Sequence, residues 1–126
     1  MEVTKTELIM LGTGNATTTR CYNTCFILKT KETILLVDAG GGNGILNQLE
    51  KVNLPIDNIH EMFVTHAHTD HILGAVWMIR IIAQRAANGH YTGKFHVYSH
   101  DKVLLVLDQI LSLIHISEPT RLALIS

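Results

Sequence analysis

The sequence predicts a single α/β domain in which strands and helices alternate along the chain. The chain has 126 residues, of which 47% are hydrophobic and 17% are charged, so it has the length and the apolar content for one core. Short apolar runs with the character of strands alternate with longer runs of helical periodicity. The sequence shows no internal repeat and no low-complexity segment that would break this pattern.

The first part of the chain is predicted to form a β-meander. The segment ELIML, residues 7–11, runs into the glycine turn GTGN. The segments NTCFILK and TILLVD, residues 23–29 and 33–38, are two further strands joined by a polar turn around Lys31. After Asp38 the run AGGGNG ends the third strand.

Helices and strands are predicted to alternate after this meander. Ile45 and Leu49 follow the spacing of an amphipathic helix that ends before Pro55. The segment EMFVT, residues 61–65, is the fourth strand. The run from about residue 71 to 88 is helical and apolar almost all round, so we expect it to pack against the sheet.

The remaining elements continue the same alternation. The segment KFHVYS, residues 94–99, is a fifth strand. Residues 101–111 form a further helix, with Ser99 or Asp101 as its N-cap.

Charge and composition limit the expected partners and compartment. Ten Lys/Arg against eleven Asp/Glu give a net charge of −1, which does not indicate a polyanion or a membrane surface as partner. The N-terminus lacks the apolar run of a secretion signal, and the longest apolar stretch, residues 72–83, is shorter than the about 20 residues that span a bilayer. Cys21 and Cys25 on one strand would lie about 13 Å apart, beyond disulfide reach, so we interpret both as free thiols. We expect a cytoplasmic protein with no membrane partner.

The strongest chemical signal is THAHTDH, residues 65–71. It lies where the fourth strand ends and the long helix begins, and open α/β sheets present their ligands at the C-terminal ends of strands. His66 and His68 can point the same way from an extended segment, while Asp70 and His71 at the helix start can reach a second position nearby. This arrangement suits two metal ions about 3.5–4 Å apart. The pattern therefore predicts a metal site rather than a solvent-exposed polar loop.

This segment resembles the HxHxDH signature of the metallo-β-lactamase superfamily. LGTGNA, LLVDAG and FVTHAHTDHILGA are also similar to the N-terminal half of that superfamily in order and spacing, over about residues 6–111. The most similar branch is that of ribonuclease Z and related phosphodiesterases. The resemblance implies that residues 1–111 are the N-terminal half of an αββα four-layer sandwich.

The resemblance also implies a role for each matching residue. His66 and His68 would bind a first zinc ion, and Asp70 and His71 a second, with Asp38 hydrogen-bonded behind them to orient the ligands. Asp70 would also be catalytic, by steering the nucleophile or handling its proton. The complete site would hold two Zn²⁺ and use a metal-bound hydroxide available near neutral pH. The implied activity is a metal-dependent hydrolase acting on a phosphodiester, with RNA among the candidate substrates and a homodimer among the expected assemblies of the full-length protein.

The expected site is incomplete in this chain. Two zinc ions need about six ligand contacts, and the superfamily's later histidines and bridging aspartate lie in a second half. We therefore expect a truncated chain that is inactive alone. Residues 112–126 do not resemble the family, and they are similar to the ends of unrelated predicted proteins from shotgun assemblies. We interpret them as an artefactual tail, with an ordinary helix end and loop as the alternative.

Other functions stay open at this point. One is a metal-binding fragment without catalysis, and another is a hydrolase of the same fold acting on a thioester, a lactone or a sulfate ester. Diiron oxidoreductases on this fold place an acidic residue where the chain has His68, which favours zinc. GTGN is not a dinucleotide fingerprint, because its third glycine is replaced by Thr17. His100 follows a strand, but the family's next metal histidine comes later, so we do not expect it to be a ligand.

Overall fold

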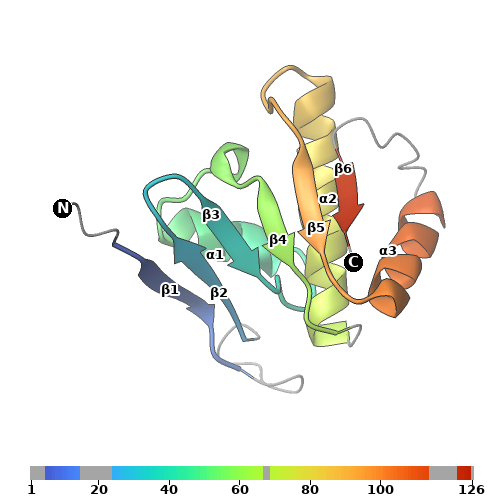
Figure 1. Ribbon diagram of the computed structural model, residues 1–126, viewed down its shortest axis with the longest axis horizontal. Coiled ribbons are helices and arrows are strands. Elements are labelled where there is room, and N and C mark those ends of the chain that lie inside the picture. Colours follow the sequence, from blue (N-terminus) through green and yellow to red (C-terminus); the bar gives the residue numbers. More distant parts are fainter. Residues whose placement is uncertain (1–4, 15–23, 67–68, 114–121, 126) are drawn as a thin grey trace.

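A computed structural model describes residues 5–14, 24–66, 69–113 and 122–125 (Figure 1). The side chains of residues 69–71, 113 and 122–124 lie outside this description. The elements, in chain order, are β1 (Glu7–Gly12), β2 (Cys25–Lys29), β3 (Ile34–Val37), α1 (Gly44–Lys51), the 3-10 helix η1 (Ile56–Asn58), β4 (Glu61–Phe63), α2 (Thr69–Ala87), β5 (Phe95–Tyr98), α3 (Asp101–Leu113) and β6 (Leu122–Ile125).

The strands form one six-stranded sheet in the order β1-β2-β3-β4-β5-β6. The first three strands pair antiparallel, which confirms the predicted meander, and β3 to β6 run parallel. A helix lies between each pair of successive parallel strands. Such crossovers are almost always right-handed, and here each one advances by one strand, so the helices are expected on a single face. Figure 1 shows α1 and α2 behind the sheet.

The core lies between this helical layer and the sheet. Ile27, Leu36, Met62 and Val97 are register partners across β2 to β5, and all four side chains are fully buried. Because side chains alternate along a strand, these residues share the face toward the helices. The helices contribute their own buried apolar residues: Ile45, Leu49, Ile72, Met78, Ile79, Ile82, Val103 and Leu107.

The opposite face of the sheet is apolar, and none of the described helices is expected to cover it. One row of register partners crosses all six strands: Met10, Phe26, Val37, Phe63, Tyr98 and Ile125. We call this row the open face. Met10 and Phe63 are 45% and 41% exposed, which is high for large apolar side chains in a sheet.

Each predicted strand and helix is present, with ends shifted by a few residues. The long helix begins at Thr69, two residues before the predicted start. Neither η1 nor β6 was predicted, and β6, which pairs in parallel with β5, lies in the segment interpreted as a tail, with a helix end and loop as the alternative. A short edge strand depends on a partner far away in the chain, so its own residues do not reveal it. The assignment of residues 112–126 as a tail outside the family stays a prediction.

The predicted N-cap of α3 was wrong. His100 holds this position, because its Nδ1 accepts the backbone N–H of Lys102 at 3.2 Å and its carbonyl accepts the N–H of Val103. Ser99 is buried, and its hydroxyl instead donates to the carbonyl of Val64. The Ser99 hydroxyl, predicted to cap α3, therefore binds the chain just after β4 instead.

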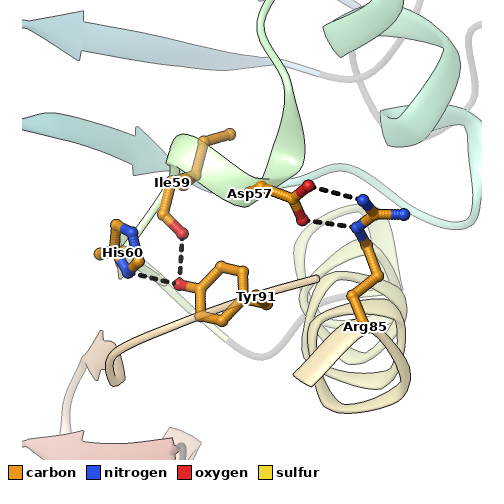
Figure 2. Close-up of polar contacts among 5 residues, drawn as sticks. All are labelled: Asp57, Ile59, His60, Arg85 and Tyr91. Carbon is orange, nitrogen blue, oxygen red and sulfur yellow. Dashed lines mark hydrogen bonds and ion pairs between the residues drawn. The ribbon is translucent and has the colours of Figure 1, made fainter. Parts of the chain in front are cut away.

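Polar contacts tie α2 to the segment that leads into β4 (Figure 2). Arg85 donates from Nε and Nη2 to the two carboxylate oxygens of Asp57, which lowers the pKa of that carboxyl group. The buried Tyr91 hydroxyl donates to the carbonyl of Ile59 at 2.7 Å and accepts from Nδ1 of His60 at 2.8 Å. These contacts position the start of β4 relative to α2, the two elements that flank THAHTDH.

Candidate metal centre

Three parallel strands end side by side and bring the candidate site together. The backbone N–H of Asp38, after β3, donates to the carbonyl of Phe63 at 2.8 Å. The N–H of Val64, after β4, donates to the carbonyl of Tyr98 at 3.0 Å. The ladder thus continues past the strand ends and sets the spacing of the residues that follow. This is the edge at which parallel sheets present functional side chains.

Asp38 and His66 are linked through the side chain of Thr65. The residue Asp38 is 5% exposed. Its Oδ1 accepts the backbone N–H of Thr65 at 2.8 Å, and its Oδ2 accepts the Thr65 hydroxyl at 2.7 Å. The Thr65 oxygen also contacts Nδ1 of His66 at 2.8 Å. The family resemblance implied a place for Asp38 behind the ligands but no role for Thr65, although a hydroxyl next to a candidate ligand is a signal visible in the sequence.

The backbone around Asp38 is held by α2. Asp38 and Gly40 have φ angles of 58° and 77°, in the left-handed region that Asp and Gly tolerate better than most residues. The N–H of Gly74 in α2 donates to the carbonyl of Gly40 at 2.7 Å. A Cβ atom at position 74 would overlap the carbonyl groups of Ala39 and Gly40. The helix therefore approaches this loop at a distance that only glycine permits.

Cys25 lies close to the Asp38 carboxylate, but its thiol is unreactive at neutral pH. Burial, together with the negative charge of Asp38, raises the pKa of the Cys25 thiol to about 12. A protonated, fully buried thiol is neither a nucleophile nor a metal ligand at neutral pH. Cys25 is a free cysteine, as sequence analysis expected, and Cys21 lies outside the described residues.

The structure describes one of the four predicted ligand side chains. His66 is half-buried at the end of β4, His68 lies outside the described residues, and so do the side chains of Asp70 and His71. The backbone of α2 places Asp70 and His71 in its first turn. Within the described parts of the chain, no three His, Cys, Asp or Glu side chains are grouped so that they could hold a metal ion. The fit to zinc therefore rests on the imidazole and carboxylate donors of THAHTDH and on the support beneath His66.

The other described histidines have surroundings of their own. His60 is engaged by Tyr91, and His100 caps α3. The ring of His96 stacks near that of Tyr98, with centroids 6.3 Å apart. That His100 is not a ligand stays a prediction.

The chain resembles known proteins over most of its length. A profile of the anti-Pycsar protein Apyc1 family matches residues 6–114. The chain belongs to this family. The Apyc1 protein of Bacillus phage 010DV004 is 33% identical over 69 residues, which cover 54% of this chain and 26% of that protein. Ribonuclease Z of Bacteroides fragilis is 29% identical over 96 residues, 75% of this chain and 30% of the enzyme. The chain thus spans less than a third of the length of the proteins in these two matches.

Solved structures show the fold of this Apyc1-family chain. Human tRNase Z, short form, superposes with a TM-score of 0.75 at 22% identity, over 93% of this chain and 42% of that chain. A diphosphatase from the PhnP family gives 0.71 at 18% identity, over 95% and 50%. The metallo-β-lactamase fold protein YhfI from Bacillus subtilis gives 0.67 at 18% identity, over 94% and 45%. The predicted N-terminal half of the metallo-β-lactamase fold is confirmed.

The proteins that this chain resembles thus include ribonuclease Z of Bacteroides fragilis and a diphosphatase from the PhnP family. In the parts of the chain that the structure describes, no helix has the length and apolarity needed to span a bilayer.

Proposed function

We propose that this chain is the metal-binding half of a zinc-dependent phosphodiester hydrolase. His66 and His68 are the proposed ligands of one zinc ion, and Asp70 and His71 those of a second. The observation that carries the proposal is the hydrogen-bonded link from the buried Asp38 to His66, because metal-binding histidines are typically held from behind by such a partner. The ribonuclease Z relatives support a phosphodiester as substrate, with RNA as one example.

The chain's own residues would act mainly by positioning. Zinc, when bound, supplies Lewis-acid chemistry and activates water near neutral pH. Asp38 holds the strand end that carries His66, and Asp70 is proposed to orient the attacking nucleophile or to take its proton. The N-terminus of the 19-residue helix α2 carries Asp70 and His71, and the dipole of the helix favours an anionic phosphate group there.

The 126 residues are proposed to bind metal without turning over substrate. Four ligands fall short of the about six contacts of a dinuclear zinc site, and this chain covers 30% of the ribonuclease Z it matches. Further ligands would come from the part of the fold that the relatives have in addition. We also propose that a longer protein carrying this chain forms a homodimer and lies in the cytoplasm.

Metal binding by the purified chain tests the proposal. The metal-free chain is titrated with Zn²⁺ in a calorimeter, beside His66→Ala, Asp70→Ala and the matched control His90→Ala, which removes an exposed histidine outside the motif. Loss of a residue behind a ligand typically weakens metal affinity by about 10–100-fold. We expect both motif variants to weaken zinc affinity by more than this, and the control to keep wild-type affinity. Unchanged affinity in His66→Ala would overturn the site.

Turnover is measured on the same preparations. Bis(p-nitrophenyl) phosphate and p-nitrophenyl acetate, each with excess Zn²⁺, are both expected to remain intact with the chain alone. Hydrolysis of the phosphodiester that disappears in Asp70→Ala would contradict the proposed inactivity and support the role of Asp70. Hydrolysis of the acetate ester alone, with the same dependence on Asp70, would contradict the proposed substrate class.

A further inference from the structure

The Thr65 hydroxyl sits between a carboxylate and an imidazole, and it has a single proton to give. Its oxygen lies 2.7 Å from Oδ2 of Asp38 and 2.8 Å from Nδ1 of His66. A carboxylate can only accept hydrogen bonds, so the hydroxyl proton points to Asp38. The lone pairs of the hydroxyl oxygen then face Nδ1, which completes the contact only if Nδ1 carries a proton.

This direction has a consequence for the other ring nitrogen of His66. A neutral imidazole with its proton on Nδ1 has its lone pair on Nε2, and the hydrogen bond made by one nitrogen decides which nitrogen binds a metal. The contact with Thr65 therefore selects between the two tautomers.

The link is also held rigidly. The backbone N–H of Thr65 donates to Oδ1 of the same carboxylate at 2.8 Å, so Asp38 fixes both the main chain and the side chain of Thr65. Asp38 is in turn anchored by its own N–H on the carbonyl of Phe63. Threonine suits this position because its branched Cβ restricts rotation about χ1.

We propose that Thr65 is a positioning residue that holds His66 in the Nδ1-protonated tautomer and so presents Nε2 as its metal-binding nitrogen. The link to metal rests on the proposed function, whereas the tautomer does not. Thr65→Val removes the hydroxyl at nearly constant shape, and Thr65→Ser retains it. Asp38→Asn keeps the shape of the carboxylate but adds an amide donor, which lets the chain of hydrogen bonds reverse, so that the hydroxyl donates to Nδ1.

The tautomer is measured directly in the metal-free 126-residue chain. Long-range ¹H–¹⁵N correlation spectra of histidine-labelled protein report which ring nitrogen carries the proton. They are recorded at about pH 8, above the ordinary pKa of an imidazole. The His66→Ala spectrum assigns the His66 signals, and His90 serves as internal control. We expect Nδ1–H in the wild type and in Thr65→Ser, and a shift toward Nε2–H in Thr65→Val and Asp38→Asn, with His90 unchanged.

Zinc titration of the same variants gives the second readout. Thr65→Val and Asp38→Asn are expected to weaken binding by about 10–100-fold, and Thr65→Ser to stay close to the wild type. An Nε2–H tautomer of His66 in the wild type overturns the inference, as does a tautomer that neither Thr65→Val nor Asp38→Asn changes. An Nδ1–H tautomer in a chain that does not bind zinc overturns the proposed function and leaves the inference on Thr65 intact. Circular dichroism checks folding, and since Asp38→Asn keeps the shape of the side chain, the test does not depend on Thr65→Val alone.

Discussion

At the residue scale, the candidate site depends on one buried carboxylate. Asp38 is 5% exposed, and both of its oxygens accept hydrogen bonds from Thr65. Burying a carboxylate without partners costs roughly several kcal/mol, and these two bonds offset part of that cost. The site residues proposed from the motif, including the role of Asp38 toward a metal, stay predictions, but the structure shows what would hold His66 in place.

Cys25 gives a pH-dependent prediction at the same scale. Burial and the charge of Asp38 raise the pKa of its thiol from 9.0 to about 12. The unfolded chain therefore loses this proton first as the pH rises, so the stabilisation is complete below about pH 9 and declines between pH 9 and 12. We expect the urea midpoint to fall above about pH 9, and to fall less steeply in Cys25→Ala.

Alkylation checks the same property independently. Iodoacetamide at neutral pH should leave Cys25 unmodified in the native chain and modify it in urea, as read by peptide mass spectrometry. Equal alkaline slopes for wild type and Cys25→Ala, together with rapid native alkylation, would show that the thiol is not protected.

At the scale of elements, the site depends on how closely α2 approaches the loop after β3. Gly74 donates its N–H to the carbonyl of Gly40, and it leaves no room for a side chain. This contact places the first turns of α2, which carry Asp70 and His71, beside the loop that carries Asp38. The Asp57–Arg85 pair links α2 to the segment before β4, and the hydroxyl of Tyr91, in the loop after α2, binds the same segment (Figure 2). The position of α2 relative to the sheet is therefore fixed by contacts near both ends of β4.

Gly74→Ala tests this approach. In an ordinary helix the change favours folding by up to about 1 kcal/mol, but the overlap with Ala39 and Gly40 should reverse the sign and cost about 1–3 kcal/mol. The free energy of unfolding from urea titration measures the difference.

Gly42→Ala is the matched control, since a Cβ there meets nothing within 4 Å. We expect it to leave the free energy of unfolding nearly unchanged. A stabilised Gly74→Ala variant would contradict the close approach.

At the scale of the whole molecule, the order of the parallel strands decides which surface remains apolar. Because β3 to β6 follow one another across the sheet, right-handed crossovers bring α1, α2 and α3 to one side. The open face is the opposite side of the sheet. The similar structures are about twice as long or longer, with this chain covering 42% of human tRNase Z and 50% of the PhnP-family diphosphatase.

Self-association of the isolated chain tests the open face. Large exposed apolar patches promote association, so we expect light scattering to show oligomers that grow with concentration, and a fluorescent apolar dye to bind. The double variant Met10→Lys and Phe63→Lys should reduce both signals.

The control for this test is Leu105→Lys, which changes an apolar side chain that is 58% exposed on α3 rather than on the sheet. It should leave association unchanged. A wild-type chain that is monodisperse, monomeric and free of dye would show that the open face does not drive association.

The sequence by itself determined the meander, the alternation of strands and helices, and the position of THAHTDH where β4 leads into α2. These depend on residues close together in the chain, whose periodicity and turn-forming residues are directly visible. Only the tertiary structure decided the partners of Asp38, the need for glycine at position 74 and the pairing of β6. Asp38 and Thr65 are 27 residues apart and meet because β3 and β4 pair in parallel, a contact that no local pattern encodes.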